Sequence, residues 1–207
     1  MDNRQTNIRQ RLSRLKNRVF SLDLQNIYQL DDPLGDERGS ASPTNITFKV
    51  YDTDEVLKVI SRVNPFSEQG RRFALKRLLS GDKAVVGYHQ DVPVFYGWLM
   101  FEEIEMTYGR FMSAPEGTAF SYNLFTATSH RRRGIMTQFY NFVGRFLNKR
   151  DFQTLYVGIA TKNRISIRAH RKSGFKEVGY FYTMKIFSIC FTFARFVVGK
   201  RFFIMCG

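Results

Sequence analysis

One stretch of the chain constrains the fold more than any other, because an apolar segment, a basic turn and an amphipathic segment follow one another directly. Residues 120–126 predict a strand, and apolar residues recur at helical spacing over 135–146. The turn between them reads Ser129-His130-Arg131-Arg132-Arg133-Gly134. At such a junction the first helix amides have no intrahelical partner, the helix dipole adds positive potential, and glycine lets a ligand approach the backbone. The stretch therefore predicts an anion site, and a pyrophosphate fits it best.

The rest of the chain alternates between strand and helix patterns. Strands are expected over 46–51, 84–88, 94–104, 120–126, 155–159 and 176–187. Helices are expected after a cap at 52–54 as far as Val63, over 67–79 and 135–146, and from Arg164 to a stop at Gly174. This order predicts an α/β protein with three layers and a mixed, partly antiparallel central sheet.

The first 44 residues are expected to stand apart from a single domain over residues 45–207. Their apolar residues recur at spacings of three and four and alternate with arginines: Ile8, Leu12, Leu15, Val19 and Leu22. This pattern predicts a basic amphipathic helix, and the polar stretch 31–44 reads as a linker. Such a helix either packs on the domain, which we favour, or forms an arm for a membrane surface or a partner.

The charge balance limits the partners. With 32 Lys and Arg against 18 Asp and Glu, the net charge is +14, which favours nucleic acid, an anionic membrane or a phosphate-rich ligand. The only cysteines, Cys190 and Cys206, exclude a disulfide framework and a cysteine zinc site, and no metal is expected. The longest apolar run is broken at Arg195, and no secretory signal is present. We expect a cytoplasmic protein, with peripheral contact to the inner face of an anionic membrane left open.

A second informative segment follows the 155–159 strand. It runs from Asn163 to Phe175, and with the basic turn it resembles the GCN5-related N-acetyltransferases (GNAT). Residues 131–136 match the family's (Q/R)-x-x-G-x-(G/A) loop. Six residues follow its N-x-x-(A/S)-x-x-x-Y-x-K-x-G-F segment, namely Asn163, Ser166, His170, Lys172, Gly174 and Phe175. The clear resemblance covers residues 120–182 and implies the GNAT fold, with a central sheet splayed at a site for acetyl-CoA.

The resemblance also implies which residues hold the cofactor. The backbone of Leu124, Phe125 and Thr126 would pair with the pantetheine amides as an added strand would. Asn163 would lie beside the pantetheine, and Ser166 would donate to the cofactor. The pyrophosphate would be bound by the Thr137 hydroxyl and by the amides of Arg131, Arg132, Arg133, Gly134, Ile135 and Met136. Met136 departs from the family pattern, which has glycine or alanine there, so its side chain is expected to crowd the phosphates.

The sequence indicates the catalytic groups less clearly than the cofactor site. His170 stands where many members carry a tyrosine proposed to protonate the departing CoA thiolate, so the resemblance implies that His170 is the general acid. An ordinary helix histidine is the competing interpretation. No carboxylate occurs in 120–126, so the candidate bases are Glu103 and Glu105 on the preceding strand, with a water relay as the alternative.

The resemblance implies direct transfer of an acetyl group from acetyl-CoA to a primary amine of a small molecule. The pattern is similar to acetyltransferases of surface-polysaccharide assembly, so an amino sugar is the expected acceptor. Two alternatives stay open. One is acetylation of, or binding to, an RNA-linked substrate such as aminoacyl-tRNA, although no RNA or DNA motif appears. The other is a non-catalytic acetyl-CoA-binding module. The oligomeric state, a homodimer included, is also left open.

Overall fold

The structure is a computed structural model that describes residues 20–31, 45–101, 103–106, 110–113, 116–186, 189–198 and 201–206. Within these residues, side chains are described for 23–31, 45–101, 116–181 and 183–184. None of the helices in these ranges is long and apolar enough to cross a membrane.

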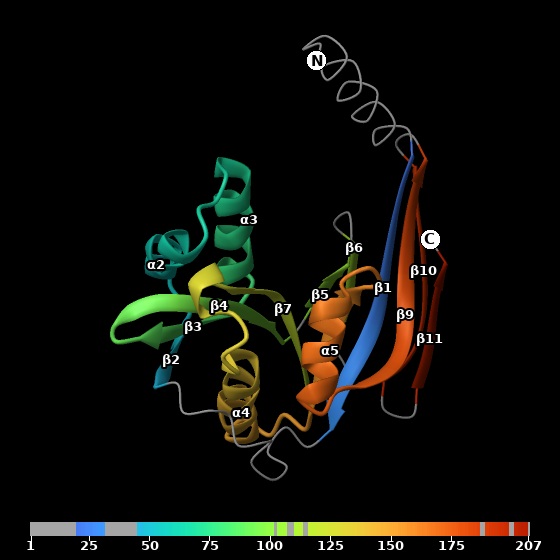
Figure 1. Cartoon of the computed structure of the whole chain (residues 1–207). Helices are drawn as coiled ribbons and strands as arrows, with labels where there is room; N and C mark the ends of the chain where they lie inside the picture. Colours follow the sequence, from blue (N-terminus) through green and yellow to red (C-terminus); the bar gives the residue numbers. More distant parts are fainter. Residues whose placement is uncertain are drawn as a thin grey trace, which may run out of the picture.

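A nine-stranded sheet forms the centre of the molecule (Figure 1). Its strands, in spatial order, are β11 (Arg201–Cys206), β10 (Ile189–Val198), β9 (Lys176–Ile186), β1 (Phe20–Asp31), β8 (Thr154–Ala160), β7 (Thr118–Thr126), β4 (Val92–Met100), β3 (Lys83–His89) and β2 (Ile46–Tyr51). Only β7 and β8 run parallel, and every other pair of neighbours is antiparallel. The expected mixed, largely antiparallel sheet is therefore confirmed.

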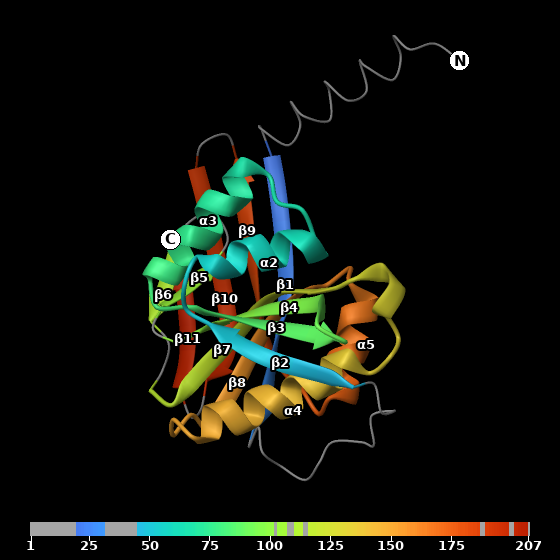
Figure 2. The ribbon, with the colours of Figure 1, turned by 90° about the vertical axis from the view of Figure 1, so that its left-hand side faces the viewer.

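Helices cover both faces of this sheet. They are α2 (Glu55–Val63), α3 (Glu68–Leu79), α4 (Ile135–Asn148) and α5 (Arg164–Lys172), with a short 3-10 turn η2 (Thr128–His130) before α4. Figures 1 and 2 show α2 and α3 above β3 and β4, and α4 below them. The three layers expected from the sequence are present.

Alternation along β4 explains why two cores form. Phe95 and Leu99 pack into the core under α4, whereas Tyr96 and Trp98, on the other face, pack against α2 and α3. Successive side chains of a strand point to opposite faces, so a strand that is apolar at every position is buried on both. Burial of these large side chains, each stabilising by roughly 1.5–3 kcal/mol, holds the layers together.

The position of β1 differs from the prediction that the first 44 residues stand apart from the domain. Residues 20–31 do not lie apart from the domain, because β1 is inserted in the sheet and pairs antiparallel with both β8 and β9. Tyr28 and Leu30 of β1 are buried in the core under α4 and α5. Leu22, assigned to the amphipathic helix, belongs to this strand. The rest of that predicted helix, and residues 32–44 of the linker, lie outside the described residues.

One further difference concerns the expected strand over 94–104. It ends at Met100, and β5 (Glu103–Met106) pairs instead with β6 (Arg110–Ser113) in a separate two-stranded sheet. The C-terminal segment forms β10 and β11 and extends the main sheet beyond β9.

Removal of residues 1–31 is expected to abolish cooperative unfolding, because β8 and β9 lose the strand that joins them and the core loses Tyr28 and Leu30. Removal of residues 1–19 alone keeps all nine strands and should keep a cooperative transition. Thermal unfolding followed by circular dichroism checks both. A cooperative transition after loss of residues 1–31 would contradict the position of β1.

Candidate functional site

The two parallel strands of the sheet separate halfway along their length. Their pairing runs from Thr118–Thr154 to Ser121–Val157 and stops there, although β7 continues to Thr126 and β8 to Ala160. Beyond Val157, β8 remains paired with β1, and β7 remains paired with β4. The facing backbone edges of β7 and β8 therefore open into a slot at their carboxyl ends, which is where α/β sheets bind ligands.

A bulge in β7 contributes to this separation. Its register with β4 shifts between Tyr96 and Trp98, and Asn123 of the bulged strand has a φ of 49°. The side chain of Leu124 then lies over Gly97, where a Cβ atom would be 2.5 Å from Leu124 Cδ2. Because a bulge bends the strand that carries it, the end of β7 turns away from β8 at this point.

Helix α4 begins beside the slot and presents free backbone donors. Its N-cap is Gly134, with a φ of 72° and no side-chain hydrogen bond to the described first turn. The first intrahelical bond runs from the Gln138 amide to the Gly134 carbonyl, so the amides of residues 135–137 precede it. Met136 is half-buried, and its side chain packs against the core. A helix start with unpaired amides and a glycine cap is the kind of arrangement that can bind an anion.

The arginines of the turn add charge and connect it to the slot. Arg131 Nε donates to the Thr126 carbonyl at 3.1 Å, and its guanidinium lies 5.6 Å from the centre of the Phe125 ring. Arg132 and Arg133 are exposed. Between residues 117 and 176, which build the slot and both adjoining helices, there are twelve Lys and Arg and one acidic residue, Asp151. Such a segment attracts an anionic ligand.

Helix α5 begins on the opposite side of the slot, after β8. The Asn163 side chain accepts a hydrogen bond from the Ser166 amide at 3.1 Å, so it caps the helix. Ser166 Oγ lies 3.3 Å from His170 Nδ1, within the helix. Asn163 is exposed, and the Ser166 hydroxyl lies beside the His170 ring within the helix.

Comparison with known proteins identifies this arrangement. The family model described as Acetyltransferase (GNAT) family matches residues 54–175, more than half of the chain. The chain belongs to the GNAT acetyltransferases. The match runs from the start of α2 to the end of α5, so it contains the slot and both helix N-termini.

Solved structures support the GNAT fold. A conserved protein of unknown function from Staphylococcus epidermidis is 13% identical with a TM-score of 0.58, over 86% of this chain and 67% of that one. A tandem GNAT protein from the clavulanic acid biosynthesis pathway is 12% identical with a TM-score of 0.55, over 80% and 54%. AAC(6')-Iy, solved with the bisubstrate analogue CoA-S-monomethyl-acetylneamine, is 14% identical with a TM-score of 0.51, over 64% and 92%.

The chain thus spans about half to two thirds of the first two of these structures. At such identities the likeness shows the fold alone. Comparison with curated proteins finds no match.

His170, at the position of the GNAT tyrosine, is buried rather than exposed in the slot. Only 1% of its surface is accessible. Its Nδ1 lies 2.7 Å from the Ser166 carbonyl, which only accepts, so Nδ1 carries the proton. The bare Nε2 then accepts from the Tyr140 hydroxyl at 2.7 Å, and Tyr140 lies 3.3 Å from Ser121 Oγ. Burial lowers the pKa of His170 to about 4, although the Ser166 carbonyl opposes this.

This arrangement favours the competing interpretation of His170 as a helix histidine with a structural role. Its one proton, on Nδ1, is donated to the Ser166 carbonyl, and Nε2 accepts from Tyr140. The chain of hydrogen bonds from Ser121 through Tyr140 to His170 connects the last paired residue of β7 with α4 and α5. His170 thus joins α5 to α4 and β7 through buried hydrogen bonds.

Glu103 and Glu105 lie on β5, outside the main sheet. Strand β4 ends at Met100, opposite Phe120, one residue before β7 and β8 stop pairing at Ser121. The side chains of both glutamates lie outside the described ones, so their role as bases stays a prediction.

A buried charged cluster on the other face of β7 was missed by the sequence analysis. Asp82 Oδ2 accepts from Arg77 Nε and from the Tyr122 hydroxyl, both at 2.7 Å. Burial and the neighbouring Asp82 carboxylate strongly raise the pKa of Tyr122. Arg77 lies on α3, Asp82 directly precedes β3 and Tyr122 lies on β7, forty residues after Asp82, so no sequence spacing joins all three.

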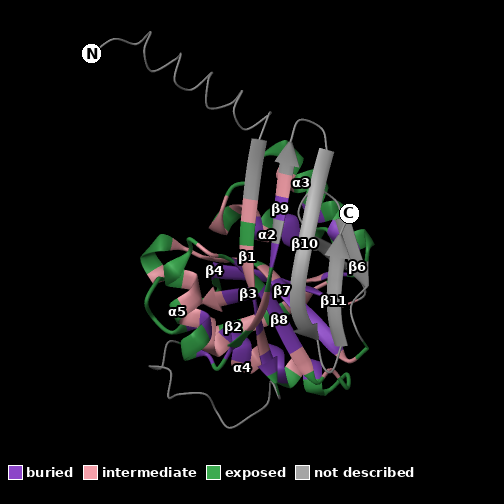
Figure 3. Ribbon diagram, turned by 90° about the vertical axis from the view of Figure 1, so that its right-hand side faces the viewer, coloured by how far each residue is buried: buried purple, intermediate pink, exposed green. Residues whose placement is uncertain are grey.

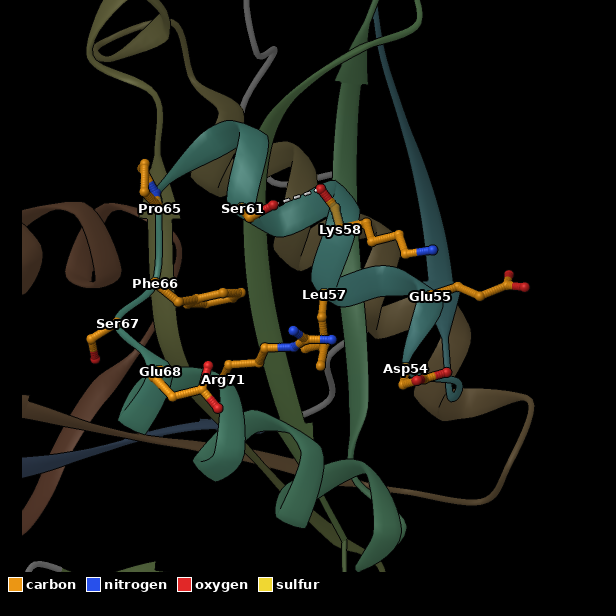
Figure 4. A pocket seen from close by; sticks show the side chains of 10 residues that line it. All are labelled: Asp54, Glu55, Leu57, Lys58, Ser61, Pro65, Phe66, Ser67, Glu68 and Arg71. Carbon is orange, nitrogen blue, oxygen red and sulfur yellow. Dashed lines mark hydrogen bonds between the residues drawn. The ribbon is translucent and has the colours of Figure 1, made fainter.

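A surface pocket of about 460 Å³ lies between α2 and α3 (Figure 4). Figure 4 shows Phe66 and Arg71 reaching into the space between the helices, with Glu55, Lys58 and Glu68 around it. None of its lining residues belongs to β7, β8, α4 or α5, so this pocket is separate from the slot.

The free energy of unfolding is expected to fall by about 3 kcal/mol as the pH drops from about 6.5 to about 4. In this range the unfolded chain binds a proton at His170 that the folded chain excludes, so the contribution is complete above pH 6.5 and lost toward pH 4. Urea unfolding across this range measures the effect. In His170→Gln the component should be absent, and an equal loss in both proteins would show that His170 is not kept neutral by folding.

Proposed function

We propose that the protein transfers an acetyl group from acetyl-CoA to a primary amine, with the CoA thioester held in the slot between β7 and β8. The observation that carries this proposal is the end of β7–β8 pairing at Ser121 and Val157, next to an α4 N-terminus that has no side-chain cap in the described turn. CoA would match both features, because it is an extended molecule with amides along its pantetheine arm and a pyrophosphate at the other end. Acetyl-CoA would supply an activated acyl group.

Different residues of the slot would bind different parts of acetyl-CoA. The backbone of residues 124–126 would pair with the pantetheine amides, as in β-strand addition. The amides of residues 135–137 would hold the pyrophosphate, with the helix dipole and the exposed arginines adding positive potential. Asn163, which already caps α5, would stand beside the pantetheine. The Thr137 hydroxyl, 3.4 Å from Ser173 Oγ, would join the phosphate donors.

The amine must lose a proton before it attacks the thioester, and the slot supports this without a carboxylate. The strands and helices around it carry one acidic residue between 117 and 176, and Asp82 on the far face is already paired with two donors. A strongly positive surrounding lowers the pKa of a nearby ammonium. Water would accept the proton, and the arginines would favour the neutral amine.

The acceptor that we propose is a small amine, with an amino sugar as the preferred class. Residues 23–116, which include α2 and α3, contain fifteen acidic and ten basic residues, so this half attracts a cationic amine and repels RNA. The AAC(6')-Iy structure, with its CoA-acetylneamine analogue, is consistent with this class.

Arg131→Glu combined with Arg133→Glu is expected to weaken acetyl-CoA binding at least about tenfold, because two positive charges beside the pyrophosphate are reversed. Titration calorimetry with acetyl-CoA measures the affinity. The matched control is Arg62→Glu with Arg72→Glu, which makes the same change in charge at exposed positions of α2 and α3. Equal weakening in both pairs would indicate a general effect of charge and remove the pyrophosphate assignment.

The pH dependence of turnover should follow the acceptor and not the enzyme. With two amino-sugar acceptors of different ammonium pKa, kcat/KM is expected to rise with pH and level off near each acceptor's own pKa. Steady-state rates across pH measure this. A rise at the same pH for both acceptors would reveal an enzymatic base. Acetyl-CoA binding without turnover of any amine would instead support a non-catalytic module.

A further inference from the structure

Two of the three histidines of the chain meet beside the basic turn. His89 is the last residue of β3, and His130 ends the η2 turn forty-one residues later. The Nε2 atom of His130 lies 3.4 Å from Nδ1 of His89, and the two ring centres are 5.2 Å apart. Both residues are half-buried. Two imidazole nitrogens therefore face each other within reach of one small ion.

The backbone holds both rings in place. Figure 3 shows buried residues along β3 and β4, and His89 follows the buried stretch of β3. The turn after it has a positive φ at both central residues, as a two-residue hairpin of type I′ requires. On the other side, the Ala127 amide donates to the Val94 carbonyl at 2.8 Å, and the His130 amide donates to the Ala127 carbonyl at 2.9 Å. The pair thus needs little ordering before it binds an ion.

Ser129 determines which nitrogen of His130 is bare. Its Oγ atom lies 2.9 Å from His130 Nδ1. A proton on Nδ1, donated to this oxygen, leaves Nε2 bare toward His89, and metal-binding histidines are oriented by the same kind of hydrogen bond. Burial lowers the pKa of His130, and the charges of Arg133 and His89 lower it further. The neutral ring that a metal ion needs therefore prevails near pH 7.

The distances between the two rings suit a shared metal ion better than a shared proton. A hydrogen bond from an N–H group normally spans about 2.7–3.2 Å between heavy atoms, so 3.4 Å is long for one. Two imidazoles on a tetrahedral Zn²⁺ ion, with Zn–N bonds of about 2.05 Å, place their nitrogens about 3.4 Å and their ring centres about 5.2 Å apart. Both observed separations agree with these values. Imidazole also selects Zn²⁺ over Mg²⁺ and Ca²⁺, which prefer oxygen ligands.

We propose that His89 and His130 bind one Zn²⁺ ion and leave two of its tetrahedral positions open. In the part of the chain that the structure describes, no group of three His, Cys, Asp and Glu residues could hold a metal, so water or a ligand completes the coordination. An anionic ligand suits these positions, because Arg133 adds positive charge near His130. The ion would fasten the β3–β4 hairpin to the turn that precedes α4. No metal was expected from the sequence, in which the two histidines are far apart. Zinc binding here does not depend on acetyl transfer.

Competition with a chromophoric zinc chelator tests the proposal on the full chain without a histidine tag. His89→Asn and His130→Asn should each weaken zinc binding at least about tenfold, because one of two protein ligands is lost. The matched control, His170→Gln, changes the third histidine, which is buried among other partners, and should bind zinc as the wild type does. Zinc should also raise the Tm of the wild type and leave that of both Asn variants unchanged.

NMR of the imidazole rings locates the ion independently of the variants. On addition of zinc to the wild type, the ring signals of His89 and His130 should shift, and those of His170 should not. Three results would overturn the proposal. The first is no binding up to millimolar zinc. The second is equal affinity in the wild type and in both Asn variants, each shown to be folded by circular dichroism. The third is bound zinc that leaves the ring signals of the pair unchanged, which would place the ion elsewhere in the chain.

Discussion

The end of pairing between β7 and β8 is the constraint on which the site depends. Two parallel strands that are hydrogen-bonded along their whole length leave no room for a ligand, whereas two that part after Ser121 and Val157 expose both backbone edges. Each strand can part from the other without losing its place because each has a second neighbour, β4 for β7 and β1 for β8. The bulge at Asn123 adds the bend, and Gly97 provides the space for it. The position of β1 is thus a requirement of the slot.

The buried hydrogen bonds of Ser121, Tyr140 and His170 fix where the separation begins. A net contribution of about 1 kcal/mol per bond is modest, but leaving one of these groups unpaired in the interior would cost roughly 1–3 kcal/mol. The network therefore specifies one arrangement of β7, α4 and α5 more than it stabilises the fold. In this GNAT chain, His170 occupies the position of the family's tyrosine and belongs to this hydrogen-bond network.

Features that depend on neighbouring residues could be predicted from the sequence, whereas contacts between residues far apart in the chain could not. The basic turn, the glycine before α4 and the start of α5 at Arg164 are local features, and the structure has them where they were expected. Strand β1 also carried a local signal, because Leu22, Leu24, Tyr28 and Leu30 fall on one face at a period of two. Leu22 fits the helical stripe before it as well, which concealed the change of period.

Other features could not be found in this way. The hydrogen bond that joins Tyr122 to Asp82 spans forty residues of the chain. The burial of His170 depends on Tyr140, thirty residues earlier. In each case, the partner is distant along the chain.

Charge is distributed along the chain in a way that matches the two proposed substrates. Residues 117–176 carry a net charge of +11, and residues 23–116 carry −5. A CoA ester is a polyanion and an amine acceptor is a cation, so each would be attracted to the half that binds it. The ammonium then becomes less stable as it nears the arginines beside the thioester, where the neutral form is needed. One gradient of potential would therefore collect the acceptor and favour its deprotonation, which explains how this site could work without a carboxylate in the strands and helices that form it.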